Sequence, residues 1–168
     1  MKKTAVIVGL LMVWLFFGMG VRSQDKDHAE LAKAMAGAKV SLEQGLAASR
    51  HAGKPISAKF EIEDGKLQLS VYTAKGDAFS EVVVDHNTRK PAKTEAITSG
   101  EDLSAARTQD EAMAKAKQSL QGALAKVLKA NPGFLAVSIF PALKDGHPVV
   151  EITLAKGDEW KTVSESLD

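Results

Sequence analysis

The side chains best suited to metal or proton chemistry are four histidines and an acidic segment near residue 25. His28, His51, His86 and His147 are far apart in the sequence, and no two stand at the spacing of a metal-binding pair. The segment 25–28 offers oxygen and nitrogen ligands, but it lacks the glycine and the distal glutamate of a calcium-binding loop. We expect solvated surface histidines, with a metal or proton-switch role as the alternative, and we predict no metal site.

The sequence carries none of the common catalytic signatures. It has no Gly-x-Ser-x-Gly, no His-Glu-x-x-His and no phosphate-binding glycine loop, and without cysteine it has no thiolate ligand or nucleophile. We therefore predict a protein that is not an enzyme, with no catalytic residues and no cofactor.

Two aromatic residues are candidates for contact with a partner protein. Phe79 and Trp160 each begin a predicted strand, shortly after a Lys-Gly-Asp turn. Aromatic side chains often anchor protein interfaces, which makes partner contact the functional hypothesis. Packing of both rings in the core is the simpler alternative.

Phe79 and Trp160 occupy equivalent places because the chain repeats itself. The ranges 64–79 and 145–160 both open on Asp-Gly, carry Ala-Lys-Gly-Asp ten positions later and close on an aromatic residue, at a shift of 81 residues. Upstream, the ranges 38–42 and 116–120 share Ala-Lys-x-Ser-Leu at a shift of 78. This repetition predicts an internal duplication.

Each copy has the periodicity of one helix followed by several strands. Apolar residues at three- and four-residue spacing predict helices over 27–46 and 108–127, each opening on a capping box. Alternating apolar residues then predict strands joined by tight turns at Asp64-Gly65 and Asp145-Gly146. The predicted strands are 56–62, 67–71, 78–85 and a short edge strand at 91–97, and then 135–139, 150–154 and 160–167.

One helix can cover only one face of such a sheet. The predicted fold class is therefore α+β, with tandem α-β-β-β(β) repeats, each a helix packed on one face of an antiparallel sheet.

Residues 1–23 differ in kind from the rest of the chain. Lys2 and Lys3 precede an apolar run from Ala5 to Val21, and Arg22 restores polar character. This pattern is typical of a secretory signal peptide, and the run also reaches the lower length limit of a membrane anchor. In either case we expect a periplasmic or secreted protein, with the membrane involved only if residues 1–23 are retained.

The chain after residue 23 is nearly neutral. It holds all 21 acidic residues and 19 of the 22 basic ones, a net charge of −2. This balance gives no electrostatic reason to expect a nucleic-acid partner. Because the chain has no cysteine, packing alone must hold the fold in an oxidising compartment.

The motifs of the first copy resemble those of PepSY domains. The match comprises a helix at 34–46, the turn Glu63-Asp64-Gly65, and Val83-Val84-Asp85 followed by Thr88. Arg89 stands where this family usually has glycine. The second copy matches through its helix and Asp145-Gly146, and it departs near Ser166, where an aspartate would be expected.

The resemblance implies tandem PepSY modules in a fold similar to that of the β-lactamase inhibitor protein. PepSY modules occur in the propeptides of thermolysin-type metallopeptidases and in exported proteins, and a role in restraining peptidases has been proposed for them. The implied organisation is a signal or anchor at 1–23, a first repeat at 24–97, a linker at 98–107 and a second repeat at 108–168.

The function hypothesis is an exported binding protein that regulates or inhibits an envelope peptidase through protein contacts. The alternative is a sensing or carrier module that holds a small ligand or a cation between the two repeats. A large apolar pocket between the repeats would favour this alternative.

Overall fold

The computed structural model describes residues 21–168, with side-chain exposure from residue 27 onward. The predicted signal or anchor lies outside this part except for residues 21–23, which begin the first helix. The α+β class is confirmed. The helices are α1 (Val21–Met35), α2 (Leu42–Ala48), α3 (Gly100–Lys115) and α4 (Leu120–Ala130), with a 3₁₀ turn at Ser49–His51. The strands are β1 (Lys54–Glu63), β2 (Lys66–Lys75), β3 (Ala78–Val84), β4 (Pro91–Ile97), β5 (Leu135–Lys144), β6 (His147–Lys156) and β7 (Glu159–Ser166).

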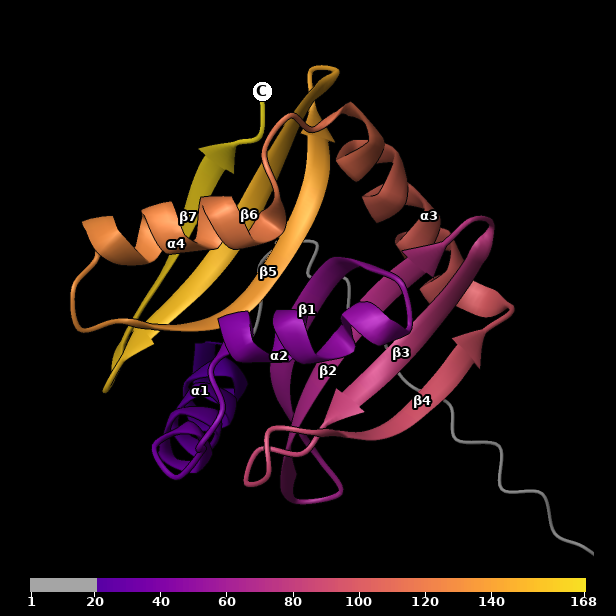
Figure 1. Cartoon of the computed structure of the whole chain (residues 1–168). Helices are drawn as coiled ribbons and strands as arrows, with labels where there is room; N and C mark the ends of the chain where they lie inside the picture. The colour runs from indigo at the N-terminus through magenta and orange to yellow at the C-terminus, as the bar shows by residue number, and fades with distance from the viewer. Residues whose placement is uncertain (1–20) are drawn as a thin grey trace, which may run out of the picture.

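The seven strands of the described chain form one antiparallel sheet (Figure 1). Their order is β4-β3-β2-β1-β5-β6-β7, so β1 and β5 join a first half (β1–β4) to a second half (β5–β7). These two strands pair only through Ala58 with Ile139 and Lys59 with Ser138. Both hairpins that flank this junction pair along nearly their whole length. The halves are therefore parts of one sheet, joined at a narrow crossing.

Both Asp-Gly turns are confirmed. Asp64 and Gly65 connect β1 to β2 with φ angles of 50° and 72°, and Asp145 and Gly146 connect β5 to β6 with φ angles of 52° and 82°. Positive φ at both central residues is type I′ geometry, whose twist matches that of the flanking strands. The edge strand predicted at 91–97 is also confirmed, as β4.

The single helix predicted over 27–46 is wrong, because the chain forms two helices with a break at 36–41. α1 begins before Asp27, so this residue is not a helix cap. Ser41 instead caps α2: its hydroxyl accepts the Gln44 N–H at 3.3 Å, and the Gln44 side chain accepts the Ser41 N–H at 3.0 Å. This capping box satisfies free N–H groups and fixes a second helix start.

The single helix predicted over 108–127 is also wrong, because the chain forms two helices there, α3 and α4, with a break at 116–119. Within the predicted linker 98–107, residues 100–107 form the start of α3, which continues through Thr108 without a new cap there. After α3 the chain leaves the helix, and the N–H of Lys117 donates to the carbonyl of Leu167 at 2.7 Å. Because this partner is distant in sequence, local periodicity does not reveal the break.

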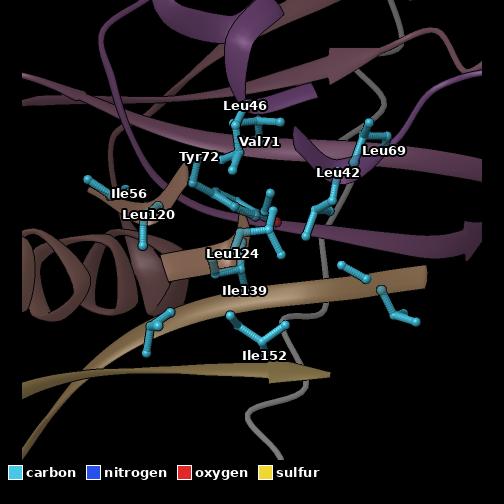
Figure 2. Packing of buried hydrophobic residues seen from close by; sticks show 14 of the residues in the cluster. Leu42, Leu46, Ile56, Leu69, Val71, Tyr72, Leu120, Leu124, Ile139 and Ile152 are labelled. Atoms are coloured by element: carbon cyan, nitrogen blue, oxygen red, sulfur yellow. The ribbon is translucent and has the colours of Figure 1, made fainter. Parts of the chain in front are cut away.

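Both halves contribute to one hydrophobic core beneath α2 and α4. Leu42 and Leu46 of α2 and Leu124 of α4 belong to the same buried cluster as Val71 and Ile139 of the sheet (Figure 2). α2 contacts β5 as well as β1 and β2, and α4 contacts β1 as well as β5, β6 and β7. Full burial of such a side chain contributes about 1.5–3 kcal/mol. The shared core therefore ties the two halves together.

α3 contacts the other face of the sheet, along β1, β2, β5 and β6. Ser57 of β1 is fully buried, and its hydroxyl donates to the side-chain oxygen of Gln109 in α3 at 2.6 Å. The next residue, Ala58, is buried in the core, and successive side chains of a strand point to opposite faces. α3 therefore covers one end of the face that α2 and α4 leave open.

Candidate functional site

The face of β1–β4 that points away from α2 carries charged and polar side chains. Alternation along β1 places Ala58 and Phe60 in the core and Lys59, Glu61 and Glu63 on the opposite face. Strand register brings polar side chains from β2, β3 and β4 beside them. We call this surface the acidic face; its polar members are Lys59, Glu61, Glu63, Lys66, Gln68, Ser70, Tyr72, Glu81, Lys93 and Glu95.

Hydrogen bonds hold the centre of the acidic face in a fixed geometry. The Glu61 carboxylate accepts from Lys59 Nζ at 2.5 Å and from Ser70 Oγ at 3.2 Å. Gln68 Nε2 donates to Glu63 Oε2 at 2.9 Å and to Ser70 Oγ at 3.0 Å. The side chains of Lys59 and Glu61 are only 17% and 27% exposed. These carboxylates are ordered in advance, which lowers the entropic cost of binding a partner.

Burial raises the pKa of two carboxyl groups at this surface, those of Glu81 and Asp102. Burial raises the pKa of the Glu81 carboxyl, and the Ser70 hydroxyl partly opposes the shift. Repulsion from Glu61 adds to the increase in the pKa of Glu81. Burial also raises the pKa of Asp102, in the first turn of α3, and that of the Tyr72 hydroxyl. Negative charge is therefore costly here, and a positive partner would relieve that cost.

This arrangement is suited to recognising positive charge. The four glutamates of the acidic face, with Asp102 beside them, outnumber its three lysines. Carboxylates form charge-assisted hydrogen bonds with lysine and arginine side chains. Within residues 21–168, no group of three or more His, Cys, Asp or Glu side chains has the geometry of a metal site.

Phe79 and Trp160, the predicted partner contacts, have different environments. Phe79 is 6% exposed and belongs to the core cluster, as the packing alternative describes. Trp160 is half-buried, and its ring stacks on the His28 ring of α1 with centroids 4.1 Å apart and planes 8° from parallel. Because β3 and β7 lie in opposite halves of the sheet, the two aromatic residues do not form one site.

The histidines are dispersed over the molecule. His51 and His147 are exposed, as expected, whereas His28 is half-buried and stacks on Trp160. His86 is half-buried, and within the part of the chain that the structure describes its Nδ1 has no hydrogen-bond partner. Nothing in these positions brings two histidines together.

Two of the cavities formed by the described residues lie near the junction of the two halves. One, of about 410 Å³, is lined by α2, β1 and the facing ends of α3 and α4. The other, of about 470 Å³, is lined mainly by apolar side chains, among them Leu42 and Phe60 of the first half and Leu128, Phe134 and Ala136 around the second. We call the second cavity the inter-half groove. Its volume is within the usual range of small-molecule sites.

Sequence periodicity alone does not reveal the acidic face. Lys59-x-Glu61-x-Glu63 is a usable signal, because it places three charges on one side of a strand whose other side is apolar. The remaining acids, Glu81 and Glu95, come from other strands, and only the strand order brings them onto the same surface.

No family model matches the chain, and no curated protein or solved structure matches it either. The resemblance to PepSY domains therefore stays a hypothesis from short motifs. None of the helices formed by the described residues is both long and apolar enough to cross a bilayer. The acidic face and the inter-half groove are therefore the features from which a function can be assigned.

Proposed function

We propose that this chain is an exported, non-enzymatic binding protein that engages another envelope protein through the acidic face. The observation that carries the proposal is the excess of ordered, half-buried carboxylates on one face of the sheet. A partner that presents lysine or arginine side chains would form charge-assisted hydrogen bonds with them. Electrostatic complementarity of this kind speeds association and weakens as salt is added.

The PepSY resemblance suggests that this binding regulates or inhibits a peptidase. The tandem repeats at 24–97 and 108–168 belong to the same proposal. Matched Asp-Gly turns and the mirrored strand order of the two halves support a duplication. Export through residues 1–23 rests on the sequence pattern alone.

Capture of partners from the exported fraction of the producing cell tests this proposal. The acidic-face variant is Glu63→Gln/Glu95→Gln, which keeps the Lys59–Glu61 pair intact. The matched control is Glu111→Gln/Glu159→Gln, which removes the same charge from exposed sites elsewhere. We expect wild type and control to recover the same partner at low salt, and the acidic-face variant to recover at least about tenfold less.

Two outcomes would contradict the proposal. Equal recovery by the acidic-face variant and the control would show that the partner binds elsewhere. Failure of the wild-type protein to recover any specific partner, in repeated experiments at low salt, would contradict the binding function itself.

Small-ligand sensing or carriage is a second candidate function. The inter-half groove favours it, because this cavity is apolar, lies between the halves and has the volume of a small-molecule site. If the two halves were packed together without such a cavity, small-ligand binding would be disfavoured.

A further inference from the structure

The inter-half groove exists because the two central strands diverge. β1 and β5 pair only at Ala58–Ile139 and Lys59–Ser138. Phe60 of β1 and Ala136 of β5 lie just beyond these pairs and face the groove. The β5–β6 pairing has a register irregularity between Ala136 and Ser138, next to the last β1–β5 pair. The cavity therefore follows from the short pairing between β1 and β5.

The walls of the groove are apolar, and its rim is positively charged. Lys39 and Arg89 line the groove, whereas Glu43 is its one acidic lining residue among those described. Behind one wall, the ammonium groups of Lys156 and Lys161 lie 5.7 and 3.9 Å from the centre of the Phe134 ring. Two cations, Lys39 and Arg89, therefore line a mainly apolar cavity.

Arg89 is held at this rim in an unfavourable backbone conformation. Its φ angle is 63°, a left-handed value that costs a non-glycine residue free energy. The carboxylate of Asp85 accepts the N–H groups of Asn87 and Thr88 at 2.9 and 2.6 Å and so shapes the turn. Arg89 Nε donates to the carbonyl of Lys39 at 2.6 Å. Among the described residues this is the guanidinium's one hydrogen bond, so its terminal nitrogens remain for a ligand.

We propose that the inter-half groove binds the anion of a free fatty acid. The hydrocarbon chain lies against Leu42, Phe60 and Phe134, and the carboxylate is held by Arg89 and Lys39. A guanidinium binds a carboxylate through two parallel hydrogen bonds, which fixes the head group at the rim. This inference rests on the second candidate function and specifies its ligand.

The charges and the size of the groove disfavour the other occupants. A cationic ligand would meet Lys39 and Arg89 with only Glu43 in opposition. A cavity of about 470 Å³ has the size of a small-molecule site, whereas a folded protein partner usually needs a surface of roughly 800 Å² on each side. A free fatty acid has the matching chemistry, because it combines an apolar chain with one carboxylate.

Binding of three twelve-carbon probes tests the proposal: dodecanoate, dodecanol and dodecyltrimethylammonium. The two ionic probes are titrated below their critical micelle concentrations and dodecanol below its solubility limit, into the protein recovered from the exporting cell, with binding followed by calorimetry. We expect one dodecanoate per chain, bound at least about tenfold more tightly than dodecanol, because only dodecanoate forms charge-assisted hydrogen bonds. The ammonium probe should bind most weakly.

Arg89→Gly is the decisive variant, because glycine accepts the left-handed φ at this position. Its melting temperature should equal or exceed that of wild type, while its preference for dodecanoate over dodecanol should fall about tenfold. Lys90→Ala is the matched control, since it removes one positive charge from the same loop at a residue that does not line the groove. This control should keep the wild-type preference.

The possible results distinguish failure of this inference from failure of the second candidate function. Equal binding of dodecanoate and dodecanol, unchanged in Arg89→Gly, would overturn the anionic head group and leave a site for apolar ligands. Tighter binding of the ammonium probe would overturn the inference in favour of cations. Binding to phospholipid vesicles with none to free dodecanoate would overturn it in favour of a membrane surface. No binding of any probe would overturn both the inference and the second candidate function.

Discussion

Glu81 faces Glu95 across the β3–β4 pair, in a part of the acidic face that Glu61 and Glu63 also approach. Directly opposed like charges destabilise a sheet by roughly 0.2–1 kcal/mol. Burial is the largest cause of the raised pKa of Glu81, because the carboxylate loses contact with water. Lys93 pairs with Glu95 at 2.8 Å and the Ser70 hydroxyl partly stabilises the Glu81 carboxylate, but the net pKa of Glu81 stays raised. A positively charged partner would offset this remaining cost.

Replacing Glu81 tests this electrostatic cost. The pKa of its carboxyl is raised above the ordinary value of 4.5, so the folded protein binds the proton more tightly than the unfolded chain does. The free energy of unfolding must therefore fall as the pH rises from 4.5 through the folded pKa, and it stays lowered at neutral pH. We expect Glu81→Gln to raise the free energy of unfolding at pH 7 by up to about 1 kcal/mol and to flatten this decline.

Urea denaturation at pH 5 and pH 7 measures both effects. Glu111→Gln, at an exposed position on α3, is the control and should change neither value by more than about 0.5 kcal/mol. A Glu81→Gln variant that is less stable than wild type at pH 7 would show that the carboxylate is stabilised where it lies.

α2 is the element most closely fitted to the sheet. It has seven residues, too few to be stable alone, and its buried positions are Leu42, Gly45 and Leu46. A Cβ atom added at Gly45 would lie 2.5 Å from a methyl group of Leu69 in β2. Glycine at this position weakens the isolated helix by up to about 1 kcal/mol, but it lets the backbone approach the sheet.

Gly45→Ala should therefore destabilise the protein although alanine is the better helix former. We expect a loss of about 1–3 kcal/mol in the free energy of unfolding, because the new methyl group overlaps Leu69. Gly122→Ala in α4 is the matched control: the nearest atom to its added Cβ is the Ser119 hydroxyl at 3.3 Å, and its stability should not fall by more than about 0.5 kcal/mol. Thermal denaturation compares the two variants, and higher stability of Gly45→Ala would contradict this contact.

The whole molecule depends on the shared core more than on the direct pairing of its halves. Only two residue pairs join β1 to β5, whereas α2 and α4 each contact strands of both halves and contact each other. Leu124 of α4 is fully buried in this core. The halves should therefore unfold together, as small single domains usually do.

Leu124→Ala tests this cooperativity. Loss of a fully buried leucine should lower the free energy of unfolding by about 2–5 kcal/mol. Native-state hydrogen exchange should show the same decrease for the slowest amides of β2 in the first half and of β6 in the second. A decrease confined to β6 would mean that the two halves unfold independently.

The local elements of this protein follow from its sequence because their causes are local. Asp64-Gly65 and Asp145-Gly146 supply the positive φ angles of their turns, and the alternation beside them defines the strands. The helix breaks are different, because Lys117 leaves the helix to pair with Leu167, a partner that no sequence window contains. The end of α3 therefore cannot be read from periodicity alone.

The sequence by itself determined the α+β class, the hairpins and the amphipathic faces, because each depends on neighbouring residues. The tertiary structure decided that β1 and β5 join the halves into one sheet, that Glu81 and Glu95 complete the acidic face, and that Arg89 meets Lys39 at the rim of the groove. The physical reason is that these arrangements depend on contacts between distant segments, which form only when the shared core is buried.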